Sequence, residues 1–198
     1  MDNFLLNKCT LQAVDESIAD ICSNFDCEHS DINDFFHNHC VLYFKELLGK
    51  TYVFTLNEDP STIVCAFTIS NDSIKTINLP KSGKRRLTKK IPHTKHMRSY
   101  PAVLIGRLGV NKIFKHQNIG SELMDFIKSW FVNTNNKTGC RYILVDAYNE
   151  ESPLKYYKKN QFTELFSSEE EERFYLNIRG HEKLRTRLLC FDLIVLNA

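Results

Sequence analysis

One segment of the sequence, Leu108–Ser121, joins an apolar strand-like run to a helical pattern through a short polar loop. The first turn of a helix carries N–H groups that lack partners inside the helix, and a partial positive charge, so it attracts an anion. Phosphate oxygens reach those groups only where the backbone comes close, which suits Gly120, and Asn118 tolerates the left-handed dihedrals that such a turn requires. The segment is therefore a candidate phosphate-binding loop, with an ordinary strand–helix connection as the alternative.

A second group of side chains that can donate hydrogen bonds or protons follows the next apolar run, Tyr142–Ala147. Asn149 comes shortly after that run, and Tyr156 and Tyr157 lie on the amphipathic helical stretch beyond it. A phenol of pKa about 10 stays protonated at neutral pH, so it can donate a proton to a leaving group. Packing in the core is the alternative interpretation for Tyr157.

The elements that must position these residues follow from hydrophobic periodicity. Helices are predicted over 11–23 and over 31–48, the second ended by Gly49 as a C-cap. The remaining predictions are a hairpin of Tyr52–Leu56 with Thr62–Ser70, a strand at 102–110, a helix at 120–132, a strand at 142–147, a helix opened by Ser152-Pro153, and strands at 162–166 and 187–193. This order predicts a mixed α/β domain with a strand–helix–strand segment at its centre.

Composition narrows the class of protein. The 198 residues suit a single domain over 1–198, and the formal net charge of +2 favours no partner. The seven cysteines are odd in number and form no C-x-x-C pair, so we expect buried reduced thiols rather than a zinc or redox site. The histidines show no ligand spacing, and no metal is predicted. With no apolar run of about 18 residues and no secretory signal, we expect a cytoplasmic protein without a membrane span.

The phosphate-loop segment resembles the coenzyme A pyrophosphate loop of GNAT acetyltransferases, written (Gln/Arg)-x-x-Gly-x-(Gly/Ala), with Lys115, Asn118 and Gly120 at its three signature places. The stretch from Asn149 to Phe162 is similar to the second signature of that family, an Asn followed by (Phe/Tyr)-Tyr-x-Lys-x-Gly-Phe, with Gln161 at the place of the glycine. The resemblance covers roughly 103–166. It implies the GNAT fold, a mixed twisted central sheet with a V-shaped split, flanked by helices.

The same resemblance implies a site for acetyl-CoA as the acyl donor. Tyr157 matches the tyrosine beside the coenzyme A sulfur, and Asn149 matches the residue that hydrogen-bonds the pantetheine arm. Val110 would offer its backbone N–H to the acetyl carbonyl. The implied cofactor-binding residues are Leu108, Val110, Lys115, His116, Gln117, Asn118, Ile119, Gly120, Ser121 and Asn149. The general base is not evident, since the central strand has no carboxylate, and Asp146 is more simply a solvated or backbone-bonded residue.

A narrower resemblance points to one branch of the family. Phe25–Phe36 resembles the Phe-x-Cys-Gly-x-x-x-Leu-Asp-x-Phe-Leu stretch, and Tyr100–Val110 resembles the Tyr-Pro-x-Pro-x-x-x-x-x-Arg-Leu-x-Val stretch, of the branch that includes the toxins of toxin–antitoxin pairs. The branch implies a primary amine as acceptor, the amine of an aminoacyl-tRNA among the candidates. It also suggests an antitoxin protein and a homodimer as partners.

The basic stretch within the excursion predicted at 71–100 supports a tRNA acceptor, because Lys and Arg neutralise phosphates. Its basic residues are Lys81, Lys84, Arg85, Arg86, Lys89, Lys90, Lys95 and Arg98. A solvated loop is an equal alternative. Other open functions are a protein or small-amine acetyltransferase and a catalytically inert CoA-binding module. Residues 167–186 are extra to the family pattern, and the acidic run Glu169–Glu172 within them is expected to be a solvated face.

Overall fold

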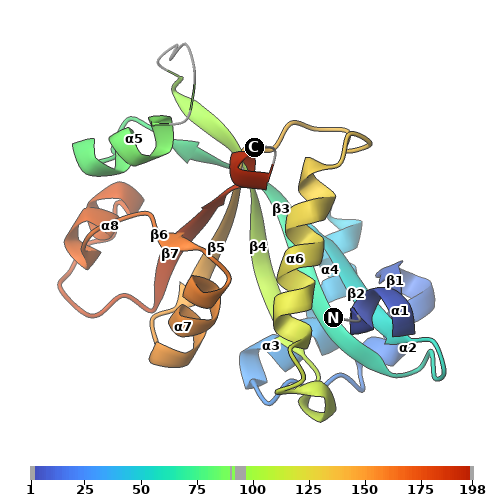
Figure 1. The fold of residues 1–198 in the computed structure, drawn as a ribbon. Helices are drawn as coiled ribbons and strands as arrows, with labels where there is room; N and C mark the ends of the chain where they lie inside the picture. The colour runs from blue at the N-terminus through green and yellow to red at the C-terminus, as the bar shows by residue number, and fades with distance from the viewer. Residues whose placement is uncertain (1–2, 90, 92–96, 197–198) are drawn as a thin grey trace. The chain divides into compact units, whose positions relative to one another are not determined.

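The computed structural model describes residues 3–89, 91 and 97–196 (Figure 1). Helical turns and strands alternate along the chain, and the helix marked η2 is a π-helical turn while η1, η3 and η4 are 3₁₀ turns. In chain order the elements are α1 (Phe4–Lys8), β1 (Cys9–Ala13), η1 (Glu16–Ile18), α2 (Ala19–Cys22), α3 (Ser30–Asp34), η2 (Phe35–His39), α4 (Cys40–Lys45), β2 (Lys50–Leu56), β3 (Ile63–Lys75), α5 (Lys81–Thr88), β4 (Ser99–Val110), η3 (Lys112–Phe114), α6 (Ile119–Val132), β5 (Tyr142–Tyr148), α7 (Glu151–Lys159), β6 (Thr163–Glu164), α8 (Glu169–Leu176), β7 (Thr186–Asp192) and η4 (Leu193–Leu196).

Within the described residues the strands form one seven-stranded sheet in the order β1-β2-β3-β4-β5-β7-β6. The predicted α/β class, a central sheet flanked by helices, is confirmed. The internal contacts group the chain into two compact units. The first unit holds Met1–Ser70 with Ile105–Lys128, and the second holds Asn71–Leu104 with Ser129–Ala198. The predicted split between the strands at 103–110 and 141–147 involves both units, and it stays a prediction.

The first unit is built on the antiparallel strands β1, β2 and β3, in which Cys9 pairs with Leu56 and Phe54 with Cys65. The predicted hairpin is confirmed, and β3 continues to Lys75. The helix predicted at 11–23 is wrong in its first part, because residues 9–13 pair with β2 instead. Pairing with β2 stabilises a strand here by more than the helical spacing of four apolar residues stabilises a helix. Only the short turns at 16–22 are helical, and their Cys22 joins a core cluster with Val14, Phe25 and Phe36.

The helix predicted at 31–48 forms as α3, the π turn η2 and α4. It ends earlier than predicted, and Gly49 is not its C-cap. Leu47 takes the left-handed conformation there, with φ 57°, and the next amide, of Leu48, donates to the Tyr43 carbonyl at 3.0 Å. This backbone pattern satisfies the last carbonyls of the helix, so the glycine has no capping role left.

The second unit is built on β5, β7 and β6, which pair antiparallel. Its core includes Tyr142, Leu144, Phe166 and Leu188. The strand predicted at 162–166 shrinks to Thr163–Glu164. The helix predicted to open at Ser152 begins at Glu151, with Glu150 as its N-cap residue.

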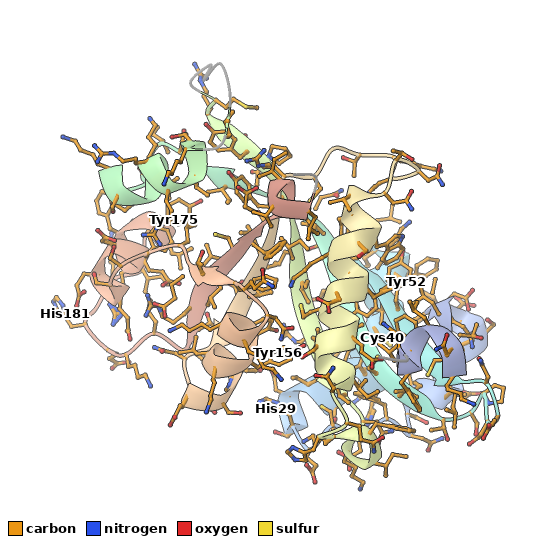
Figure 2. The ribbon with its side chains drawn as sticks, in the orientation of Figure 1. His29, Cys40, Tyr52, Tyr156, Tyr175 and His181 are labelled. Carbon is orange, nitrogen blue, oxygen red and sulfur yellow. The ribbon has the colours of Figure 1, made fainter. Side chains whose placement is uncertain are left out.

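The basic excursion is shorter than predicted, because strand β3 reaches Lys75 and strand β4 begins at Ser99. It contains α5, which lies beside α8 in Figure 1. Tyr175 of α8, labelled in Figure 2 between these two helices, accepts a hydrogen bond from the Lys75 amide at 3.0 Å. Lys90 and Lys95 of the basic stretch lie outside the described residues.

The prediction of a solvated face for the acidic run 169–172 is wrong for Glu172. Glu172 is 1% exposed, and it binds Arg187 through one oxygen at 2.6 Å and the Leu188 amide through the other, also at 2.6 Å. The cause is tertiary: β7 presents a buried guanidinium, and a buried charge requires a partner. None of the helices in the described part of the chain has the length and apolarity needed to cross a membrane.

Candidate functional site

The phosphate-loop segment begins where β4 ends, at a buried asparagine. The side chain of Asn111 donates to the Ile63 carbonyl at 2.9 Å and accepts from the Ile113 amide at 3.2 Å. Its backbone amide donates to the Val64 carbonyl at 2.9 Å. These three bonds tie the start of the loop to β3 and cap η3, so the chain leaves the strand in one fixed direction.

The loop then turns through two left-handed residues. His116 has φ 63° and Asn118 has φ 65°, and α6 starts directly after Asn118. The Asn118 carbonyl accepts from the amides of Ser121 at 3.0 Å and Glu122 at 3.2 Å, which makes it the first acceptor of the helix. The predicted left-handed conformation of Asn118 is confirmed. An asparagine adopts it at lower cost than most side chains.

Cationic side chains surround this turn. Lys115 pairs with Glu28 at 2.7 Å, and Lys112 pairs with Asp26 at 2.9 Å. Hydrogen bonds from the Glu28 amide, Lys112 and Asn33 hold the pKa of Asp26 well below its usual range. The Lys115–Glu28 pair is exposed, with 34% and 60% of the two side chains accessible, so it contributes little stability. Lys115 can therefore exchange this carboxylate for a phosphate at small cost.

The strand before the loop, which carries Leu108 and Val110, packs closely on the segment around Cys27. A Cβ atom placed on Gly109 would lie 3.0 Å from the Phe25 ring and 3.1 Å from the Cys27 sulfur, so only glycine fits without a shift. Leu108 and Val110 flank this contact and are partly exposed. The close approach fixes this end of the strand, and with it the backbone of Val110.

In the second unit, Tyr157 lies on α7 within a row of aromatic rings. Its ring centroid is 5.0 Å from that of Tyr156 and 5.6 Å from that of Phe162, both with steeply inclined planes. The side chain is partly exposed, yet its surroundings exclude enough water that burial raises the pKa of Tyr157 above its ordinary value, and the Asp146 carboxylate raises it further. The phenol therefore stays protonated at neutral pH and above, as a proton donor must.

The end of α7 shows how Gln161 can stand at the place where the resembled motif has a glycine. Gln161 has φ 65°, the amide of Gln161 donates to the Lys158 carbonyl at 2.9 Å, and the amide of Phe162 donates to the Tyr157 carbonyl at 3.0 Å. This is a Schellman motif, in which the left-handed place is normally glycine. Gln161 thus keeps the backbone turn that the missing glycine would make, and with it the position of Phe162 against Tyr157.

Asn149 follows β5 and is held by the segment that the sequence left unexplained. Its side-chain nitrogen donates to Glu169 at 2.9 Å and to the Leu184 carbonyl at 2.9 Å. Glu169 could not be identified from the sequence, because nothing in a run of four glutamates distinguishes the one that contacts Asn149. The general-base candidate Asp146 is exposed on β5, and its charge acts on Tyr157.

The predicted site residues therefore form two groups. Leu108, Val110 and the loop residues 115–121 belong to the first unit, whereas Asn149 and Tyr157 belong to the second. The loop fits an anionic group such as a pyrophosphate, since it joins a helix start, two left-handed residues and two lysines. Across the described ranges, 3–89, 91 and 97–196, no three His, Cys, Asp or Glu side chains lie together as a metal site.

No family model matches the sequence. Solved structures do match it over nearly its whole length. The AtaT protein complexed with acetyl-methionyl-tRNAfMet has a TM-score of 0.65 and 20% identity, covering 96% of this chain and 97% of that chain. A tyrosine-to-phenylalanine variant of KacT has a TM-score of 0.64 and 16% identity, covering 96% and 98%. AtaTR bound with acetyl-CoA has a TM-score of 0.62 and 18% identity, covering 97% and 99%. The chain therefore has the fold seen in the AtaT and KacT structures.

Proposed function

We propose that the protein is an acetyl-CoA-dependent N-acetyltransferase that moves the acetyl group to a primary amine. The observation that carries the proposal is the loop Lys115–Ser121, in which left-handed His116 and Asn118 lead directly into α6. Such a loop favours the pyrophosphate of coenzyme A at the helix start. The fold likeness supports the same donor, because AtaT structures are described with acetyl-CoA.

In the proposed reaction, each site residue has a separate role. The neutral amine attacks the thioester carbonyl carbon, and the backbone N–H of Val110 stabilises the oxyanion that develops, which is usually the largest contribution. The carbon–sulfur bond then breaks, and Tyr157 donates its proton to the departing thiolate. The amine loses its extra proton to water or to Asp146. Asn149 holds the pantetheine arm.

For the acceptor, we propose the α-amine of an aminoacyl-tRNA. One similar structure is AtaT with acetyl-methionyl-tRNAfMet. In the second unit, Lys81 and Arg85 of α5 and Lys89 at its C-cap are exposed and can neutralise phosphates. Arg86 has a different role, since its guanidinium donates to the Glu164 carbonyl at 2.8 Å. By the same analogy we propose an antitoxin partner, since AtaT is also described bound to the antitoxin AtaR. A homodimer and a cytoplasmic location stay predictions.

The test is acetyl transfer from labelled acetyl-CoA to a panel of acceptors: aminoacyl-tRNAs, peptides with free amino termini, and small primary amines. We expect label on the aminoacyl-tRNA, released with the amino acid after mild alkaline hydrolysis. Label on peptides or small amines alone would select the alternative acetyltransferase functions. Acetyl-CoA binding by calorimetry without transfer to any acceptor would select the inert module, which the preserved turns at Asn118 and Gln161 disfavour.

The tRNA acceptor has its own test in the salt dependence of binding. Replacing Lys81, Arg85 and Lys89 with glutamine removes exposed positive charges at α5 while leaving Arg86 on its structural partner. The slope of log affinity against log salt concentration should become shallower by up to about three, because fewer counterions are released. A slope equal to that of the wild type would move the tRNA site away from α5.

A further inference from the structure

The amide of Asn149 has no freedom to flip. Its nitrogen carries two hydrogens, and both are used: one is donated to Glu169 at 2.9 Å and the other to the Leu184 carbonyl at 2.9 Å. A carboxylate and a carbonyl can only accept, so the reversed amide would place its oxygen against two acceptors. The side-chain oxygen of Asn149 is therefore directed away from Glu169 and keeps its capacity to accept.

Glu169 is itself held firmly. The oxygen that does not meet Asn149 accepts from the Leu184 amide at 2.7 Å and from Arg173 at 3.3 Å. It stands in the first turn of α8, where a carboxylate is favoured, directly after Ser168, which caps that helix by accepting from the Glu171 amide. Each carboxylate oxygen thus has a defined partner.

We propose that Glu169 is a positioning residue, which fixes the amide of Asn149 so that its oxygen accepts from an N–H group of the pantetheine arm. The inference rests on the proposed function, because it takes coenzyme A as the ligand of Asn149. It gives residues 167–186 a role in the site: this segment supplies both Glu169 and the Leu184 carbonyl, the two acceptors that set the polarity of Asn149.

The variant Glu169→Gln tests the proposal with almost no change of shape. A glutamine has only one oxygen, so it cannot accept from both Asn149 and the Leu184 amide. When its nitrogen faces Asn149, the Asn149 amide either keeps its orientation with one acceptor lost or flips and places its oxygen against the Leu184 carbonyl. In both cases the side-chain oxygen of Asn149 is no longer fixed towards the ligand. The matched control is Glu170→Gln, which removes the same charge from the same helical turn at an exposed residue.

The probes are coenzyme A and adenosine 3′,5′-bisphosphate, which keeps the nucleotide but lacks the pantetheine arm. By calorimetry, Glu169→Gln should weaken coenzyme A binding about three- to tenfold and leave the bisphosphate unchanged, as expected for one lost hydrogen bond to the arm. Glu170→Gln should change neither affinity. In an Asn149→Ala background, Glu169→Gln should have no further effect on coenzyme A, because Glu169 acts through Asn149.

Two results would overturn the positioning role: unchanged coenzyme A affinity in Glu169→Gln, or equal weakening of both probes, which indicates a general disturbance. If the wild type binds neither probe, the proposed function fails instead. Should Glu169→Gln not fold, Glu169→Asp replaces it. This variant keeps the charge but withdraws the carboxylate from Asn149 by one methylene, and the same selective loss is expected.

Discussion

The two units prepare their parts of the candidate site in different ways. In the first, the loop at 115–121 is shaped by backbone dihedrals, with left-handed His116 and Asn118 ahead of α6. In the second, Asn149 is held by the hydrogen bonds that its side chain donates to Glu169 and to the Leu184 carbonyl, and Tyr157 by aromatic packing. A site built from backbone tolerates changes of side chain that keep the dihedrals. A site built from side chains depends on each chemical group, so the second unit should be the more sensitive to conservative substitution.

The largest effect is expected in the second unit, from Tyr157→Phe. The ring and its packing remain, but the proton donor for the leaving thiolate is lost. General acid catalysis contributes typically about 10²–10⁴-fold, so kcat should fall within that range while the KM for acetyl-CoA changes little. The control is Tyr156→Phe, which should retain most of the activity. Equal losses in the two variants would make Tyr157 a packing residue.

The next largest effect is expected in the first unit, where we expect only a substitution that repels the phosphates to weaken acetyl-CoA binding. Gly120→Asp introduces a negative charge at the start of α6, and we expect acetyl-CoA affinity to fall by about tenfold or more in calorimetry. Gly139→Asp is the control, because a side chain there meets no atom within 4 Å. Unchanged affinity in a folded Gly120→Asp protein would place the pyrophosphate elsewhere.

A smaller effect concerns how the free energy of unfolding depends on pH. The two units are compared here through the buried thiols of Cys9, in the first unit, and Cys190, in the second. Burial raises the pKa of Cys9 and of Cys190 to about 11, well above the usual value of a thiol. The unfolded chain therefore ionises first, and the stabilisation is complete below pH 8.5 or so and is lost as pH rises towards about 11. Denaturant titrations at pH 8 and 10 should show a loss of roughly 1–2 kcal/mol per thiol at pH 10.

The Cys9→Ala and Cys190→Ala variants show which unit contributes that loss. The free energy of unfolding of each variant should depend less on pH than that of the wild type, even where the variant is less stable at pH 8. A pH dependence that neither variant reduces would mean that these thiols do not control alkaline unfolding. If only Cys190→Ala reduces it, Cys9 does not contribute to the alkaline loss of stability.

The smallest effect concerns the left-handed residues themselves. Gln161→Gly should raise the free energy of unfolding by about 0.5–1 kcal/mol, because relief of left-handed strain exceeds the entropy cost of glycine. Asn118→Gly should gain less, since asparagine already tolerates φ 65°. Thermal unfolding of the two variants gives the comparison. A loss of stability in Gln161→Gly would show that its side chain supports the turn.

Periodicity predicted the central elements well: the hairpin, the strand at 102–110, the helix at 120–132 and the strand at 142–147 all form, within a few residues. These elements bury regular apolar faces, which a local pattern records. The N-terminal strand could not be predicted, because its partner β2 lies some forty residues along the chain. The predicted dihedral of Asn118 is confirmed, since it depends on a local turn. Glu169 was missed because its partners come together only in the folded chain.

The buried pair of Glu172 and Arg187 constrains how the extra segment can be inherited. Glu172 gives one oxygen to the guanidinium and the other to the Leu188 amide, and Arg187 is only 8% exposed. A chain that lost residues 167–186 would lose the buried carboxylate of that pair, and Arg187 would keep only Glu164, 3.1 Å away, as a counter-charge. Deletion of the segment therefore favours a second change in β7. Descendants without it should carry an uncharged residue at the place of Arg187, and this position would record the order of the two events.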